Sequence, residues 1–156
     1  MATVGTAGTV GTVATMRTVV PVPAPAVELL ERSRAGLFAA AMAVHSGERY
    51  VAAHLSALRA AAAVLATRGR PSGRGAGPRS VWEVLPRVAP ELTEWAAFFA
   101  AGADRRAAVE AGRVDAVRVR EADDELRAAE TFVQLVEDAL GLDRHPALPV
   151  LRPALP

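Results

Sequence analysis

The sequence contains no cysteine, lysine, asparagine or isoleucine, and only 4% of its residues are aromatic. The lack of cysteine excludes disulfide bonds, zinc–thiolate sites and a cysteine nucleophile. Strong β-formers other than valine are few, whereas alanine, the best helix former, supplies 35 of the 156 residues. The chain is therefore expected to be a single-domain, all-α protein with a mainly aliphatic core.

Charge is unevenly distributed along the chain, although the formal net charge is only +1. Residues 1–79 carry nine arginines against three acidic residues, and residues 80–156 carry nine arginines against fourteen. The basic half could attract nucleic-acid phosphates, or oppositely charged helices could pack together within a bundle or across a dimer. We prefer the second interpretation, because net charge bears on association and not on fold.

No segment is expected to cross a membrane. The most apolar stretch, residues 51–67, is interrupted by His54 and Arg59 and is shorter than the roughly 20 residues that a span requires. The N-terminus lacks the basic and leucine-rich regions of a secretory signal. These features predict a cytoplasmic protein.

Low-complexity and proline-rich segments divide the chain. Residues 1–25 combine a threonine repeat with closely spaced prolines and are predicted to be a disordered tail, within which Met16 is a second candidate start. Residues 68–79 form a flexible Gly/Pro/Arg linker, and residues 142–156 form a second, proline-rich tail. The helical domain is predicted over residues 26–141.

Apolar residues recur at helical spacing in four segments of this domain. The segments cover residues 25–44, 48–67, 81–99 and 118–140, and residues 104–110 could add a short polar helix. Amphipathic segments with short or flexible joins predict an up-down bundle of four to five helices.

The second and third segments carry the most specific local predictions. Apolar side chains in the second step by four and three residues, so this helix is expected to bury a stripe of Val51, Leu55, Leu58, Ala62 and Leu65. Pro86 and Pro90 are expected to kink the third helix, or to split it into two helices that share one buried face. Ser80 is predicted to cap its start, with Glu83 three residues later, and Gly102 to end it.

Three stretches resemble the small stand-alone HEPN proteins of actinobacteria. They are ERYVAAHL from Glu48, SVWEVLPRVAPELTEWAAFFAAG from Ser80 and READDELRAAETF from Arg120. The resemblance covers roughly residues 27–141 and implies a HEPN-like helical bundle. HEPN domains often dimerise; some are metal-independent ribonucleases of toxin or defence systems, and others bind RNA or proteins without catalysis. The resemblance therefore implies a homodimer with RNA or a protein as its partner, and no cofactor or metal.

The catalytic motif of HEPN ribonucleases is an arginine followed, after four to six residues, by a histidine. Arg49 and His54 bracket four residues and meet this spacing. The imidazole would accept the proton of a ribose 2′-hydroxyl, and the arginine would stabilise the developing charge on the phosphate. In catalytic members the motif usually lies on the last long helix, whereas here it lies on the second. We therefore prefer a non-catalytic binding module with a core-edge histidine, and retain a ribonuclease that uses Arg49 and His54 as the alternative.

Two further groups of charged residues are candidate sites. The linker arginines could contact nucleic-acid phosphates: Arg68, Arg70, Arg74 and Arg79. The glycines between them form a G-x-G-x-G string that lacks the strand and the Lys-Ser/Thr of a phosphate loop. The start of the last helix carries four carboxylates: Glu121, Asp123, Asp124 and Glu125. They are interpreted as helix capping and solvation rather than as a metal site. Asp124 can also form an ion pair with Arg127.

Overall fold

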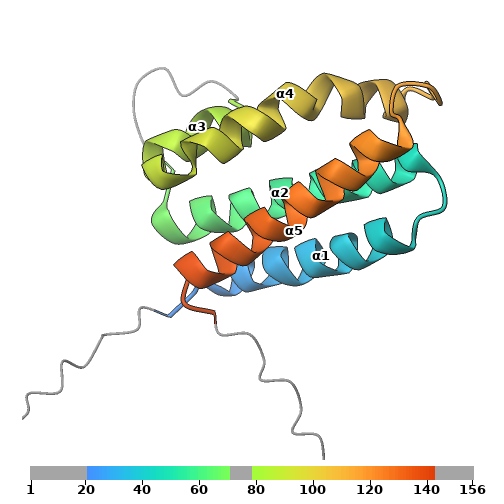
Figure 1. Ribbon diagram of the computed structural model, residues 1–156. Helices are drawn as coiled ribbons and strands as arrows, with labels where there is room; N and C mark the ends of the chain where they lie inside the picture. The colour runs from blue at the N-terminus through green and yellow to red at the C-terminus, as the bar shows by residue number, and fades with distance from the viewer. Residues whose placement is uncertain (1–20, 71–78, 143–156) are drawn as a thin grey trace, which may run out of the picture.

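The computed structural model describes residues 21–70 and 79–142 of the chain (Figure 1). Within these residues there is no strand, and the elements in chain order are α1 (Ala24–Met42), α2 (Ser46–Arg68), α3 (Val81–Val88), the 3-10 turn η1 (Pro90–Leu92), α4 (Thr93–Glu110) and α5 (Val119–Ala139). The prediction of an all-α bundle is confirmed. Most of the predicted N-terminal tail, residues 71–78 of the predicted linker and all but the first residue of the predicted C-terminal tail lie outside the described residues.

α2 is the central helix of the bundle. It forms an antiparallel hairpin with α1, while α4 lies on its other side and α5 crosses in front of it (Figure 1). α2 contacts α1, α3, α4 and α5, and α1 also contacts α5. The hydrophobic core is therefore built around α2, which with 23 residues is also the longest helix described.

α2 buries a different face from the one that its sequence pattern predicts. Five alanines on this helix have no exposed surface: Ala53, Ala57, Ala60, Ala61 and Ala63. Of the predicted stripe, only Leu65 is fully buried, and four members are half-buried: Val51, Leu55, Leu58 and Ala62. The prediction is wrong for these four because apolar periodicity finds a stripe but not the neighbours that cover it. The small alanines let adjacent helices approach closely.

Substituting leucine at a buried and at a half-buried alanine tests this orientation of α2. Ala57→Leu is expected to lower the free energy of unfolding by about 1 to 3 kcal/mol, because Ala57 is fully buried and added carbon atoms must displace its neighbours. Ala62→Leu is expected to change it by less than about 0.5 kcal/mol. Urea unfolding followed by circular dichroism measures both, and equal losses would contradict the observed orientation.

The two prolines split the third predicted segment as expected. α3 ends at Val88, η1 spans Pro90–Leu92, and α4 begins at Thr93. Leu85 of α3 and Phe99 of α4 are both fully buried in the same hydrophobic core, so the two helices share one buried face.

The start of this segment is also as predicted, but its end is not. The backbone N–H of Glu83 donates to Oγ of Ser80 at 3.3 Å, which confirms the predicted cap. α4 continues through Gly102 to Glu110, so the expected short helix over 104–110 is the last part of α4. The prediction that Gly102 ends a helix is wrong, because its role is to provide space rather than a turn. A Cβ atom there would lie 2.4 Å from Oη of Tyr50.

α2 also has the composition of a membrane-spanning helix. Among the described residues, it is the helix that is long and apolar enough to cross a bilayer, with a mean hydropathy of 1.3 over an 18-residue window. Neighbouring helices bury 56% of that window. The core helix of a soluble protein meets the same criteria, so this composition is weak evidence for a membrane span.

Candidate functional site

The predicted catalytic pair lies near the start of α2, where this helix meets the start of α5. Five residues at 100° each place Arg49 and His54 about 140° apart around the helix axis. The side chain of Arg49 is 22% exposed, whereas His54 has no exposed surface. The two side chains therefore point into different surroundings and have different partners.

Arg49 connects the turn before α2 to α5. Its guanidinium pairs with the carboxylate of Asp123 and donates a hydrogen bond of 2.8 Å to the carbonyl oxygen of Ala43. A phosphate approaching Arg49 would have to compete with Asp123 for the same charged donor group. The position of Arg49 is thus explained by packing of α2 against α5 and against the end of α1.

His54 is enclosed in the interior of the bundle. Its Nδ1 lies 2.9 Å from Oε1 of Glu125, which is itself only 5% exposed. This distance is that of a hydrogen bond between the imidazole and the carboxyl group of Glu125. Three aromatic rings have centroids 6.0 to 6.1 Å from that of the imidazole: Tyr50, Trp82 and Phe99. Nε2 is buried without a hydrogen-bond partner among the residues that the structure describes.

Tyr50 closes this cluster on the side of α4. Its hydroxyl donates to the carbonyl oxygen of Gly102 at 3.3 Å, and the guanidinium carbon of Arg105 lies 5.9 Å from the centroid of its ring. Burial raises the pKa of Tyr50, and the nearby carboxylate of Glu125 raises it further. We call Tyr50, His54, Gly102 and Glu125 the His54 cluster; it joins α2, α4 and α5 through polar groups in the core.

The four acidic residues at the start of α5 each pair with a different basic residue. The pairs are Glu121–Arg105 at 3.7 Å, Asp123–Arg49, Asp124–Arg127 at 2.9 Å and Glu125–His54 at 2.9 Å. The predicted Asp124–Arg127 pair is confirmed. The other three pairs join α5 to neighbouring helices, so capping and solvation explain only part of this group of carboxylates. Within residues 21–70 and 79–142, no three His, Cys, Asp or Glu side chains gather as a metal site would require.

Helix capping does explain part of the position of Glu121. Its carboxylate accepts a hydrogen bond of 2.8 Å from the backbone N–H of Arg118, at the start of α5. This hydrogen bond lowers the pKa of Glu121, because it stabilises the ionised carboxylate. The capping interpretation therefore holds for this one member of the group.

Three of the four linker arginines lie within the described residues: Arg68, Arg70 and Arg79. Arg68 forms an ion pair with Glu91, and this contact joins the end of α2 to η1. Arg70 and Arg79 are exposed. Arg74 and the G-x-G-x-G string lie outside the described residues. Contact of these arginines with nucleic acid stays a prediction.

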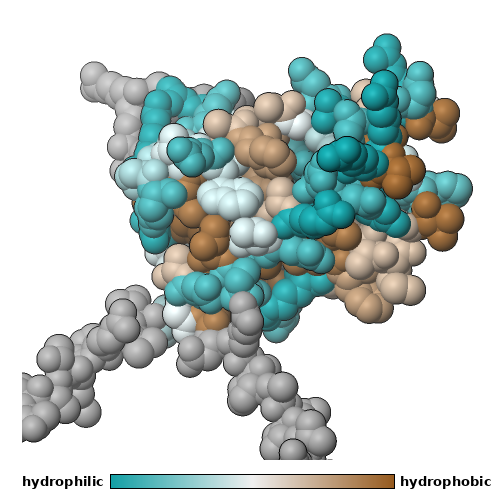
Figure 2. Space-filling model, in the orientation of Figure 1, coloured by the Kyte–Doolittle hydropathy of each residue, from teal (hydrophilic) through white to brown (hydrophobic). Residues whose placement is uncertain are grey.

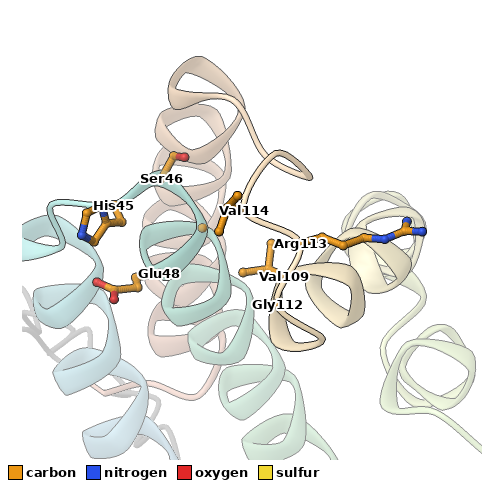
Figure 3. Close-up of a pocket in the computed structure, with 8 residues that line it drawn as sticks. His45, Ser46, Glu48, Val109, Gly112, Arg113 and Val114 are labelled. Atoms are coloured by element: carbon orange, nitrogen blue, oxygen red, sulfur yellow. The ribbon is translucent and has the colours of Figure 1, made fainter.

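A hollow of about 340 Å³ lies where the turn between α1 and α2 meets the end of α4 (Figure 3). His45 and Glu48 project to one side of it, and Arg113 extends away from it (Figure 3). Ligand sites combine an apolar lining with a few converging polar groups. Because the charged side chains here diverge, the hollow lacks that arrangement.

Sequence reasoning did not associate Glu125 or Gly102 with His54, although both belong to the His54 cluster. Sequence reasoning places Glu125 among solvated carboxylates, although it stands three residues after Ala122 and four before Ala129, both fully buried on α5. That spacing is the signal that could have placed Glu125 on the buried face. Gly102 has no comparable signal, because its contact with Tyr50 spans 52 residues of sequence.

The helical architecture is that of a HEPN-like bundle. Comparison with protein-family models matches residues 40–137, which are 98 of the 156 residues, to the SAV_6107-like HEPN family. The chain belongs to this family, so the predicted HEPN resemblance is confirmed. No curated protein and no solved structure matches the chain.

Proposed function

We propose that this chain is a non-catalytic module of the HEPN family that binds a partner protein in the cytoplasm. The observation that carries the proposal is the burial of His54, which has no exposed surface and whose Nδ1 is engaged by Glu125. A general base must come within about 3 Å of the proton that it removes. His54 is buried beside the rings of Tyr50, Trp82 and Phe99, so a ribose hydroxyl cannot come that close to its imidazole in this packing.

Exposed apolar side chains favour a protein over RNA as the partner. Phe38, Met42 and Val44 are 71%, 68% and 86% exposed. Large exposed apolar patches are typical of protein contacts, whereas RNA binding depends on basic side chains and stacking aromatic residues. Arg68, one of the predicted phosphate-binding residues, is paired with Glu91.

A metal-independent endoribonuclease that uses Arg49 and His54 is the alternative function. The spacing of these two residues favours it, because it matches the catalytic motif of other HEPN proteins. For this activity the bundle would have to open so that the imidazole and the guanidinium reach one phosphodiester.

Incubation of the purified chain with a long single-stranded RNA in EDTA is expected to yield no cleavage products on a denaturing gel. The physical reason is that His54 cannot reach the 2′-hydroxyl. A metal-independent ribonuclease serves as the positive control. Cleavage by the wild type that is lost in both His54→Ala and Arg49→Gln, with each variant folded by circular dichroism, would establish the alternative.

Filter binding of the same RNA separates the two kinds of partner. The chain is expected to retain little RNA at about 50 mM salt, where phosphate contacts are strongest. Retention at low salt that falls steeply at about 200 mM, without cleavage, would replace the protein partner with RNA.

A further inference from the structure

One face of α2 is left open between α1 and α4. Val51 and Leu55 are half-buried and line an open groove of about 460 Å³ together with Gly36 and Ala39 of α1 and Val109 of α4. Val51 and Leu55 belong to neither of the two hydrophobic clusters that form the core. The described helices therefore leave two large aliphatic side chains of α2 available for contact with another molecule.

The α1 side of the groove continues into exposed apolar residues. Residues 35–44 read AGLFAAAMAV and contain no polar side chain, yet Ala40 is the single fully buried residue among them. Met42 is 68% exposed and stands three residues after Ala39, so the two lie on the same side of α1. Figure 2 shows apolar side chains gathered at the end of the molecule where α1 leads into α2. Because large exposed apolar patches are typical of interaction sites, this surface indicates a contact with a partner.

The groove carries opposite charges toward its two ends. Glu48 and Glu110 line it near the start of α2, and Arg59 lines it eleven residues after Glu48. Eleven residues of helix span about 16 Å and return to nearly the same face. A Cβ atom at Gly36 would lie 3.2 Å from a guanidinium nitrogen of Arg59, which places this charge beside α1.

The charges at both ends are available to a ligand. Among the described residues, neither Glu48 nor Arg59 forms an ion pair, whereas Glu110 pairs with Arg106 of its own helix at 3.7 Å. A molecule that lies along α2 in this groove therefore meets a carboxylate near one end and a guanidinium near the other.

We propose that this groove binds an amphipathic α-helix of a partner protein, packed antiparallel to α2. The bound helix carries an apolar stripe, an acidic residue near its N-terminus that meets Arg59, and a basic residue about three turns later that meets Glu48. This order of charges also stabilises the bound helix itself, because the helix dipole favours acidic residues at the N-terminus and basic residues at the C-terminus. The inference rests on the proposed function in that the partner is a protein, and it adds the surface and the kind of segment that is bound.

The shape of the groove favours a helix over an extended segment. The described residues contain no strand, so an extended peptide would find no sheet edge with which to pair. A helix satisfies its own backbone hydrogen bonds and needs only side-chain contacts. Val51 and Leu55 are four residues apart, which is the spacing of the ridges that pack into the grooves of a neighbouring helix. Gly36 and Ala39 add little height to the α1 side, so the bound helix can approach α2 closely.

The shape also favours a helix over a second copy of the same face. Two identical grooves that face each other across a two-fold axis leave both hollows unfilled, and unfilled space forfeits the contacts of the atoms that line it. The convex, apolar side of a single helix fills one groove. The test below distinguishes these two occupants.

A pair of designed peptides tests the proposal. The first is a fluorescent helical peptide of about 18 residues, with leucines three and four residues apart, glutamate near its N-terminus and arginine eleven residues later. Fluorescence anisotropy is expected to show that it binds the full chain with a Kd below about 100 μM. The second peptide has the glutamate and the arginine exchanged. It is expected to bind at least about fivefold more weakly, because like charges then meet at each end of the groove.

Three variants of the full chain complete the experiment. Leu55→Glu introduces a charge into the groove and is expected to raise the Kd of the first peptide at least about tenfold. The double variant Glu48→Arg/Arg59→Glu is expected to abolish or reverse the preference between the two peptides. Glu130→Arg, at an exposed position of α5, is the matched control and should leave both Kd values unchanged. Circular dichroism verifies that each variant is folded.

Several results would overturn the proposal. They are absence of binding at about 1 mM peptide, equal binding of the two peptides, unchanged binding to Leu55→Glu, and an unchanged preference in the double variant. Light scattering of the chain alone gives a further one. If the chain is a dimer that Leu55→Glu dissociates, a second copy and not a partner helix occupies the groove.

These outcomes are separate from the test of the proposed function. A chain that binds neither peptide and leaves RNA intact in EDTA would refute the helix-binding groove but leave the non-catalytic module in place. A chain that binds the first peptide and cleaves RNA through His54 would refute the non-catalytic module and keep the groove.

Discussion

His54→Leu is expected to lower the free energy of unfolding by about 3 to 5 kcal/mol, a large part of the stability of a small domain. The variant leaves the carboxylate of Glu125, which is only 5% exposed, without the partner that lies 2.9 Å away in the wild type. An unpaired buried carboxylate is far more costly than a paired one, because neither water nor protein replaces the lost interaction. Urea unfolding at neutral pH, followed by circular dichroism, measures the loss.

A double variant separates the polar contact from the packing of the ring. His54→Leu/Glu125→Leu removes both polar groups together and is expected to recover much of the lost stability. His45→Leu, at an exposed histidine, is the matched control and should change the stability by less than about 0.5 kcal/mol. If the double variant is as unstable as the single one, the pairing of His54 with Glu125 does not explain why His54 is present.

Gly102→Ala is expected to lower the free energy of unfolding by about 1 to 3 kcal/mol, although alanine favours a helix interior by up to about 1 kcal/mol over glycine. The new Cβ atom would lie 2.4 Å from Oη of Tyr50 and 3.4 Å from Nδ1 of His54. Tyr50 is only 1% exposed, so its hydroxyl cannot move away without displacing other core atoms. The same unfolding measurement reports the change.

Removing the hydroxyl identifies the cause of that loss. Tyr50→Phe deletes the atom that the new Cβ would meet, and alone it should cost about 1 kcal/mol through the lost hydrogen bond to Gly102. Gly102→Ala is then expected to be neutral, or stabilising by up to about 1 kcal/mol, in the Tyr50→Phe background. Additive losses in the double variant would show that the close approach of Tyr50 is not the reason for glycine at this position.

Of the residues varied here, His54 is the one that a motif search would assign to catalysis, together with Arg49. In this chain the Arg-x4-His spacing coincides with two contacts that hold α2 against α5, one through Asp123 and one through Glu125. A structural role for Arg49 and His54 therefore accounts for the same residue types that the catalytic motif requires.

The features that local chemistry controls could be predicted from the amino-acid sequence. The last helix was expected over residues 118–140 and is observed over Val119–Ala139, because helical periodicity and end signals act within a few residues. Pro86 and Pro90 interrupt a helix in any context, since proline lacks the backbone donor and clashes with the preceding turn. Family membership was likewise evident from contiguous stretches of sequence.

The tertiary structure decided which face of α2 is buried and what surrounds His54. Val51 and Leu55 belong to the apolar pattern of α2 but are only half-buried, whereas five alanines outside that pattern have no exposed surface. His54 and Glu125 are 71 residues apart in sequence, so no local signal joins them. The physical reason is that burial depends on which helices pack side by side, and that choice is made by the size and shape of all contacting faces together.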